Sequence, residues 1–192
     1  MDPIDRPAAI PEPPALSDGQ VLLRAWTYYD LPCVEEASRD QGIPAGTSVP
    51  SPFSHEAGLA FIERQWHLSV SGEGLSLAVA EVAGDTAIGS VCLLQRQEPG
   101  VVRVSYWMVG SRRRRDLARR GLILLSRWAL SLPAVARLEA LAEPGDAGSV
   151  RVLEAAGFRR EGLLRAYLAL PTARADALLF SMIPADLGSS TR

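Results

Sequence analysis

Apolar residues recur along the chain with two different periods, and each period predicts one type of element. Short runs of aliphatic and β-branched residues between Gly, Pro and Asp turns predict strands at 20–26, 75–82, 87–94, 101–109, 137–142, 158–167 and 176–183. Apolar residues at every third or fourth position predict helices at 30–37, 54–70, 116–132 and 146–156. This order of elements indicates one mixed α/β layer without internal repeats.

Capping residues support the predicted helix boundaries. Asp30 stands at the N-cap of the first helix, with Pro32 in its first turn, and Ser54 stands at the N-cap of the second. Either Asp146 or Ser149 begins the last helix. The strands between 75 and 109 are joined by short Gly-containing turns, so we expect an antiparallel meander there.

The two ends of the chain differ in composition from the part between them. Residues 1–17 are rich in Pro and Ala and offer little to bury, so we expect a flexible tail there and a short tail at 188–192. A chain of 192 residues with 47% hydrophobic and 22% charged residues is typical of a soluble protein with one core. The sequence therefore predicts one domain over 18–187.

Charge and cysteine content narrow the function classes. The formal net charge of −2 argues against a general binder of nucleic acid or anionic membranes. All 20 basic residues apart from histidine are arginines, which excludes a lysine nucleophile. Cys33 and Cys92 lie far apart and predict small buried groups rather than a disulfide. Since the sequence shows no cationic leader and no long apolar run, we expect a cytoplasmic protein.

Three other groups of residues have simple interpretations. His55 and His67 have a spacing that fits no helical metal pair, so we expect no metal site. The arginines between 112 and 120 lack the interleaved aromatic residues of a nucleic-acid patch. Six aromatic residues either line a substrate pocket or, as we favour for most of them, pack in the core: Trp26, Tyr28, Tyr29, Phe53, Trp66 and Trp107.

Two stretches carry a family resemblance. The first is Tyr106-Trp107-Met108-Val109, which runs into an arginine-rich turn and a helix, and the second is Ser149 to Phe158, followed by Glu161 to Arg165. Together they resemble the GNAT superfamily of acyl-CoA-dependent N-acyltransferases over about residues 20–184. The second stretch is similar to the Rim-type branch, which acetylates the N-termini of ribosomal proteins and many small amines.

The resemblance implies both a fold and the molecules bound. The implied α/β fold has a central, mostly antiparallel sheet of about seven strands flanked by about four helices. Acetyl-CoA or another acyl-CoA is the implied co-substrate, and a small amine or a protein N-terminus is the implied acceptor. Dimers are common in relatives, which leaves a homodimer open.

The resemblance also places the cofactor. Unpaired amides and the positive end of a helix attract anions, so a strand that turns tightly into a helix can hold a pyrophosphate. This cradle corresponds to Arg113, Arg114, Arg115, Asp116, Leu117 and Ala118, and Met108, Val109 and Asp146 correspond to contacts with the pantetheine arm. Relatives usually have glycine where Arg114 and Asp116 stand. The stretch is therefore either a cradle or a solvated cationic turn in which Asp116 caps the helix.

The catalytic positions depart from the family pattern as well. Ser149 matches the residue proposed in this branch to protonate the leaving thiolate, although it also suits a helix N-cap. Leu153 stands where many relatives have a tyrosine acid, and Arg103 stands where many have a glutamate base. Asp146 replaces an asparagine and is either a cofactor ligand or a helix cap.

These features predict transfer of an acyl group, usually acetyl, from acyl-CoA to a primary amine by direct attack in a ternary complex. The alternative is a GNAT-fold protein with impaired catalysis that acts as a ligand-binding or interaction module. The departures at Arg103, Arg114 and Asp116 motivate that alternative.

Overall fold

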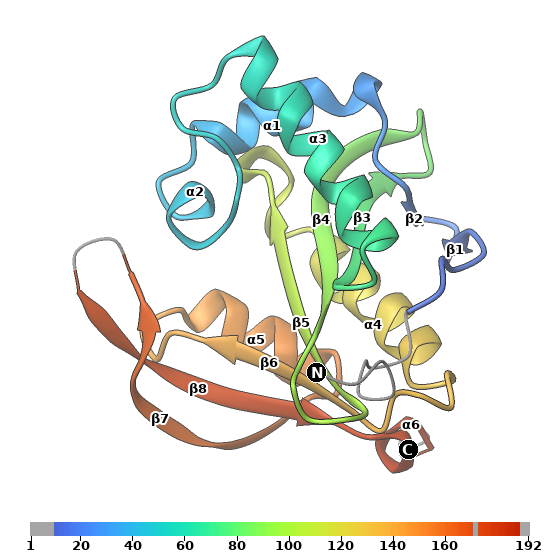
Figure 1. The fold of residues 1–192 in the computed structure, drawn as a ribbon, viewed down its shortest axis with the longest axis vertical. Coiled ribbons are helices and arrows are strands. Elements are labelled where there is room, and N and C mark those ends of the chain that lie inside the picture. The colour runs from blue at the N-terminus through green and yellow to red at the C-terminus, as the bar shows by residue number, and fades with distance from the viewer. Residues whose placement is uncertain (1–9, 171–172, 189–192) are drawn as a thin grey trace.

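The computed structural model describes residues 10–170 and 173–188 (Figure 1). Its strands are β1 (Leu16–Ser17), β2 (Val21–Arg24), β3 (Gly74–Glu81), β4 (Thr86–Gln95), β5 (Val101–Met108), β6 (Arg137–Ala142), β7 (Arg159–Ala169) and β8 (Arg174–Met182). Its α-helices are α1 (Leu31–Ser38), α2 (Ile43–Gly46), α3 (His55–Val70), α4 (Leu117–Ala129), α5 (Ala147–Ala155) and α6 (Pro184–Leu187). Two 3-10 turns, η2 (Tyr28–Asp30) and η3 (Gly110–Arg112), precede α1 and follow β5.

The strands form one sheet in the order β1-β2-β3-β4-β5-β6-β8-β7. Strands β3, β4 and β5 make the expected antiparallel meander. The pairing of β5 with β6 is parallel, whereas the other pairs are antiparallel. The predicted α/β fold with a mostly antiparallel sheet is confirmed, with eight strands in place of about seven.

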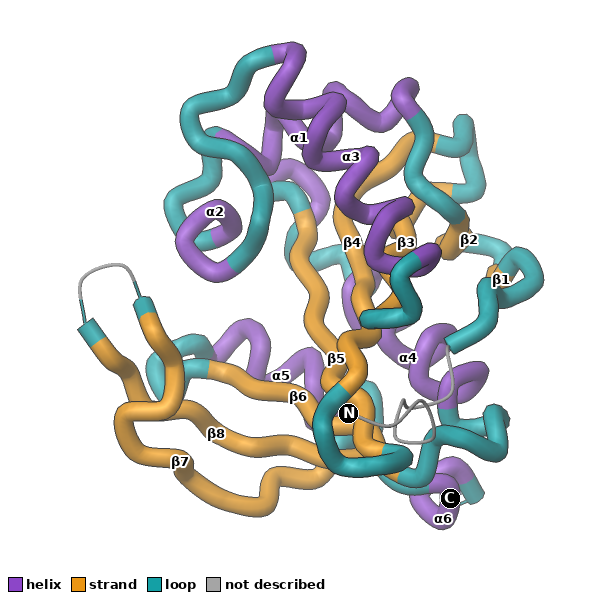
Figure 2. The backbone as a smooth tube through the Cα atoms, viewed as in Figure 1, coloured by secondary structure: helices purple, strands orange, loops and turns teal. Residues whose placement is uncertain are grey.

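Helices cover both faces of this sheet, as Figure 2 shows. Helix α3 packs on β3 and α1 on β4, whereas α4 packs on β2, β4 and β5, and α5 on β6 and β7. The core between these layers is closed by fully buried side chains such as Phe61, Leu125, Leu153 and Phe180. Because α4 follows β5 and α5 follows β6, both helices begin at the same edge of the sheet, where two adjacent parallel strands end.

The N-terminal segment differs from its sequence-based expectation. Residues 1–9 and 189–192 of the expected tails lie outside the described residues. Ile10 is buried in the core, and Leu16–Ser17 form β1 against β2. The segment 10–17 therefore packs onto the domain, because even a Pro-rich stretch can bury a single Ile and add two residues to a sheet edge.

Asp30 corrects a second expectation. It occupies the N-cap of α1, but its side chain makes no capping bond to that helix. The carboxylate is 3% exposed and instead accepts bonds from Arg24 at 2.8 and 2.9 Å and from the Thr27 amide at 2.8 Å. Asp30 thus holds the end of β2 to the turn that begins α1.

Replacing Asp30 by asparagine is expected to lower the free energy of unfolding by about 3 kcal/mol, because it breaks a buried ion pair and leaves the exposed Asp85 as the remaining carboxylate partner of Arg24. Equilibrium unfolding in urea measures the change. The matched control is Glu35→Gln, which removes the exposed partner of Arg39 and should change stability by less than about 1 kcal/mol. Equal effects of the two substitutions would contradict the structural role given to Asp30.

Candidate functional site

The segment between β5 and α4 forms a tight loop with two residues in the left-handed region. Arg114 has φ 62° and Asp116 has φ 64°. Glycine adopts this conformation without strain, whereas other residues pay about 1 kcal/mol or more. The backbone here therefore follows a path that favours glycine, although the chain carries arginine at the first position and aspartate at the second.

Helix α4 begins directly after this loop. Its first hydrogen bond runs from the Arg120 amide to the Asp116 carbonyl at 3.2 Å, so the amides of Leu117, Ala118 and Arg119 precede the helical ladder. Asp116 is the N-cap residue, but its side chain caps none of these amides. The first turn of α4 thus presents amide donors and the positive end of the helix dipole to an anion.

The Asp116 carboxylate lies along the helix surface and is bound there by an arginine. Both of its oxygens accept bonds from Arg119, at 2.6 and 2.5 Å. This interaction lowers the pKa of Asp116, so the carboxyl is ionised at neutral pH. Arg120 lies 3.6 Å from the same carboxylate and also binds Asp18 at 2.6 Å. The negative charge is therefore compensated locally, which the sequence does not reveal.

Five contacts fix the start of the loop before it reaches the two left-handed residues. The Val109 amide donates to the Ile88 carbonyl, and the Ser111 amide donates to Glu36, each at 3.0 Å. Arg112 binds Glu81 at 3.0 Å. Arg113 donates to the Met108 carbonyl at 3.0 Å and pairs with Asp40 at 2.7 Å. The loop is thus tied to α1, β3 and β4 on one side.

These contacts divide the arginines of the loop, three of which belong to the predicted cradle, into two groups. Arg112 and Arg113 are engaged with the scaffold, whereas Arg114 and Arg115 are exposed and make no ion pair with the described residues. Met108, the last residue of β5, and the following Val109 are both buried. The Met108 carbonyl accepts a hydrogen bond from Arg113. Arg114 and Arg115 are therefore the cradle side chains that remain available to an anion.

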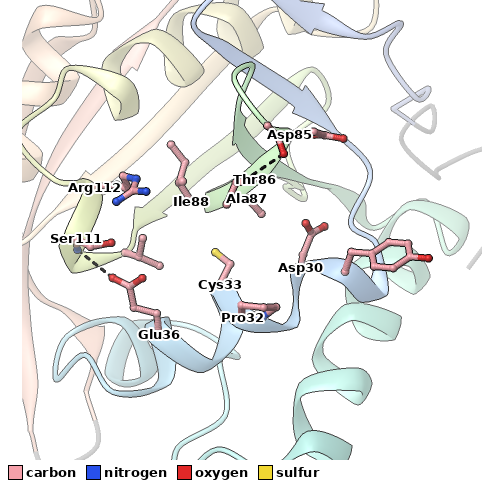
Figure 3. Close-up of a pocket in the computed structure, with 13 residues that line it drawn as sticks. Asp30, Pro32, Cys33, Glu36, Asp85, Thr86, Ala87, Ile88, Ser111 and Arg112 are labelled. Atoms are coloured by element: carbon pink, nitrogen blue, oxygen red, sulfur yellow. Dashed lines mark hydrogen bonds between the residues drawn. The ribbon is translucent and has the colours of Figure 1, made fainter.

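A cavity of about 360 Å³ lies on the α1 side of the loop (Figure 3). Its wall includes Asp30, Glu36, Asp85 and Arg112, together with Cys33 and Ile88. Each of its charged groups already has a partner in the scaffold. Burial raises the pKa of the Cys33 thiol, which keeps that group neutral and weakly reactive. The cavity therefore belongs to the packing that holds the loop in place.

Strands β5 and β6 separate beside the loop. They pair at only three positions, and the last of these is Arg103 with Glu139. Beyond that pair β5 continues to Met108 along β4, while β6 pairs with β8. Among the described residues, no neighbouring strand covers this edge of the β5 backbone from Val104 to Met108, and such an edge can hydrogen-bond an extended amide chain.

An ion-pair network occupies the point where the two strands part. Arg103 binds Glu139 at 3.1 Å, and Arg137 binds the other oxygen of the same carboxylate at 3.0 Å. Arg137 also binds Glu161, and its hydrogen bonds lower the pKa of the Glu161 carboxyl to about 2. Two other glutamates that could act as a base lie elsewhere, because Glu81 binds Arg112 and Glu98 lies in the turn before β5. Only Glu139 lies at this position, and two guanidinium groups hold it.

The first turn of α5 faces β5 across the separated strands. Asp146 is the N-cap and accepts from the Ser149 amide at 3.0 Å, so of the two candidates Asp146 caps this helix. The Ser149 hydroxyl donates to the other Asp146 oxygen at 2.6 Å. Tyr106 of β5 donates to the Ser149 carbonyl at 3.2 Å. Leu153 is fully buried in the core.

The remaining candidates are distributed between core and surface. Trp26 is buried, and Phe53, Trp66 and Trp107 pack against the core, whereas Tyr28 and Tyr29 are 49% and 93% exposed. Cys33 and Cys92 are free thiols. Within residues 10–170 and 173–188, no group of three or more His, Cys, Asp or Glu side chains is arranged to hold a metal ion. No helix in the described part of the chain is long and apolar enough to cross a membrane.

Comparison with known proteins adds a family and a set of similar folds. The family model described as acetyltransferase (GNAT) domain matches residues 20–159. No curated protein matches the chain.

Several solved structures share the fold at low sequence identity. Ribosomal-protein-S5-alanine acetyltransferase from Vibrio fischeri has a TM-score of 0.74 at 20% identity, covering 89% of this chain and 97% of that chain. RimJ from Mycobacterium smegmatis, solved with CoA-disulfide, has a TM-score of 0.75 at 20% identity over 87% and 83% of the two chains. The microcin C7 self-immunity acetyltransferase MccE, solved with acetyl-CoA and AMP, has a TM-score of 0.76 at 13% identity over 88% and 98%.

Proposed function

Because the chain belongs to the acetyltransferase (GNAT) domain family, we propose that it is an N-acyltransferase that moves an acetyl or other acyl group from acyl-CoA to a primary amine. The amine attacks the thioester directly while both substrates are bound. The observation that carries the proposal is the loop at residues 113–118, which has left-handed backbone at Arg114 and Asp116 and leads into open amides at the start of α4.

The proposed cradle binds the pyrophosphate of the acyl-CoA. The amides of Leu117, Ala118 and Arg119 and the helix dipole supply the backbone part of the site. Arg114 and Arg115 add exposed cationic side chains, each able to form two hydrogen bonds with a phosphate. Two solved structures of similar fold contain a CoA species, in RimJ and in MccE, which supports this choice of ligand.

The open edge of β5 is the proposed place for the pantetheine arm. Residues 104–108 run past the last pair with β6, and the first turn of α5 with Asp146 lies opposite. An arm inserted between these elements would pass Ser149, which we keep as the proton donor that the sequence motif indicates. Its hydroxyl would have to turn away from Asp146 to reach the leaving sulfur.

The acceptor amine must lose a proton, and the carboxylate that lies beside the usual base position in the described structure is already bound. Arg103 stands at the position of the usual base, and its partner Glu139 is held by two arginines. We propose that water or the weak basicity of the acceptor itself serves instead. Ribosomal-protein acetyltransferases among the similar folds make a protein N-terminus one reasonable acceptor, and a small amine is the other.

The free cysteines also bear on the cellular compartment in which we propose that the reaction takes place. Two free thiols at separate places in the fold suit a reducing compartment, so we place the activity in the cytoplasm. The binding-module alternative depended on the departures at Arg103, Arg114 and Asp116. Because the loop keeps the left-handed backbone at Arg114 and Asp116, the two departures in the loop do not favour this alternative.

A transfer assay tests the proposed function. The protein is incubated with acetyl-CoA and longer acyl-CoA donors against a panel of peptide N-termini and small amines, and thiol release and acylated product are measured together. We expect turnover with at least one acceptor. The variant Arg114→Gly/Asp116→Gly is assayed in parallel. Tighter acetyl-CoA binding by that variant, with no wild-type turnover on any amine, would favour the binding-module alternative.

Replacing Asp116 by asparagine is expected to tighten acetyl-CoA binding about tenfold, which corresponds to about 1.4 kcal/mol. Asparagine tolerates the left-handed backbone, so the substitution removes the charge beside the phosphates and releases Arg119 while keeping the loop. Isothermal titration measures the affinity. Glu98→Gln, in the turn before β5, is the control and should leave affinity unchanged. Weaker binding by Asp116→Asn would mean that the carboxylate supports the cradle.

A further inference from the structure

Tyr106 joins the two walls of the opening between β5 and β6. It lies three residues beyond the last β5–β6 pair, on the strand face that carries Val102 and Val104 into the core. Its hydroxyl reaches the first turn of α5 and donates to the Ser149 carbonyl at 3.2 Å. A ligand that enters between these strands must therefore pass this phenol.

Two hydroxyl groups, those of Tyr106 and Ser149, thus face the path proposed for the thioester. They differ in the hydrogen bond that each must break to reach the sulfur. The Ser149 hydroxyl donates to the ionisable Asp146 at 2.6 Å, a short charge-assisted bond. The Tyr106 hydroxyl donates to a neutral carbonyl over a longer distance. Bonds to charged groups contribute about twice as much as neutral ones, so Tyr106 can turn to a new acceptor at the lower cost.

The acidity of the Tyr106 phenol determines whether it can transfer its proton to the leaving thiolate. Burial, with a smaller contribution from the charge of Asp146, raises the pKa of Tyr106 to about 12. The phenol therefore remains a donor throughout the range in which a protein works. A thiol has a pKa of about 8.5, so a thiolate is too weak a base to remove this proton completely. The interaction available to Tyr106 is a hydrogen bond to the thiolate rather than transfer of the proton.

We propose that Tyr106 is a catalytic residue whose hydroxyl turns from the Ser149 carbonyl to the leaving sulfur and stabilises the developing thiolate. The acceptor nitrogen bonds to the thioester carbonyl carbon, and the carbon–sulfur bond breaks with its electron pair remaining on sulfur. The thiolate leaves while hydrogen-bonded to Tyr106 and then takes a proton that Ser149 relays from water, and the proton lost by the nitrogen goes to water. This inference rests on the proposed acyl transfer.

The pKa of the CoA thiol bound to the protein tests this role directly, because a purely structural residue would not change it. Thiolate absorbance in the ultraviolet is titrated against pH for CoA bound to the wild type, Tyr106→Phe and Ser149→Ala. We expect Tyr106→Phe to raise the pKa of the bound thiol by about one unit and to lower kcat about a hundredfold, as loss of one donor to a developing anion does. CoA affinity should change little.

Three other results overturn the inference, and they can be told apart. If Tyr106→Phe binds CoA with an unchanged thiol pKa, Tyr106 does not contact the sulfur. If only Ser149→Ala shifts that pKa, Ser149 is the residue that contacts the sulfur, and Tyr106 has no part in stabilising the thiolate. If the wild-type protein binds no CoA at all, the proposed acyl transfer fails first, and the role of Tyr106 fails with it.

Discussion

Replacing both Arg114 and Arg115 by glutamate is expected to weaken acetyl-CoA binding by about a hundredfold or more. Each arginine can form charge-assisted hydrogen bonds with a phosphate, worth about 1.5–3 kcal/mol apiece, and each glutamate adds a repelling charge. The exposed positions of both side chains, without scaffold partners in the described structure, mean that the fold should be unaffected. Isothermal titration gives the affinity, and thermal melting checks the fold.

A variant with the same change in net charge provides the control. Arg64→Glu/Arg96→Glu alters one exposed residue on α3 and one in the turn before β5, both away from the loop. This control should bind acetyl-CoA with nearly wild-type affinity at physiological salt, where charges more than about 8 Å apart are screened. A similar loss in both variants would show that overall charge, rather than a cradle at Arg114 and Arg115, attracts the ligand.

Replacing Gly89 by alanine should cause the largest combined loss of stability and binding. Gly89 pairs with Met108 at the end of β5, and a Cβ there would lie 2.3 Å from the Trp107 carbonyl oxygen. Backbone atoms must then move apart, and we expect a loss of about 3 kcal/mol in unfolding free energy, at the upper end for overpacking. Because the loop begins directly after Met108 and Val109, a displacement of these residues should move the loop, and acetyl-CoA affinity should fall as well.

Gly74→Ala separates these two effects. A Cβ at Gly74 would lie 2.2 Å from the Leu93 carbonyl oxygen, an equally severe conflict at the start of β3. Its cost in stability should resemble that of Gly89→Ala, while the folded fraction keeps its acetyl-CoA affinity. Urea unfolding and titration of both variants decide the question. Loss of affinity in both, or in neither, would contradict the view that the end of β5 positions the site.

The sequence predicted most of the fold because its elements are governed by local patterns. The seven strands and four main helices appear within a few residues of their predicted bounds, and Ser54 caps α3 as expected, accepting from the Ala57 amide. The exceptions are the short elements. Strand β1 and helices α2 and α6 contain two to four residues, too few for a hydrophobic period to be visible.

The site was less predictable, because its geometry depends on contacts between distant segments. The sequence identified Arg114 and Asp116 as departures, but only the backbone shows that both keep a left-handed conformation. The tolerance of aspartate for this region was the one local signal. The attachment of Arg113 to Asp40, and the pairing of Arg103 with Glu139, depend on loop packing and on the register of β5 with β6. Neither can be read from spacing along the chain.

The bond from Tyr106 to Ser149 illustrates the same limit. Both residues lie in the motifs that carry the family resemblance, yet they are separated by 43 positions and meet only across the opening between β5 and α5. The sequence therefore indicated a serine as the single hydroxyl near the leaving group. The structure adds a second hydroxyl from the opposite wall and shows that the serine is already bonded to Asp146.

The central claim is that the loop at residues 113–118 binds the pyrophosphate of an acyl-CoA, and isothermal titration of the wild-type protein with acetyl-CoA tests it most directly. We expect saturable binding at one site per chain, weakened by added salt because the phosphates contact Arg114 and Arg115. No heat of binding at millimolar concentrations of acetyl-CoA and of longer acyl-CoA donors would contradict it.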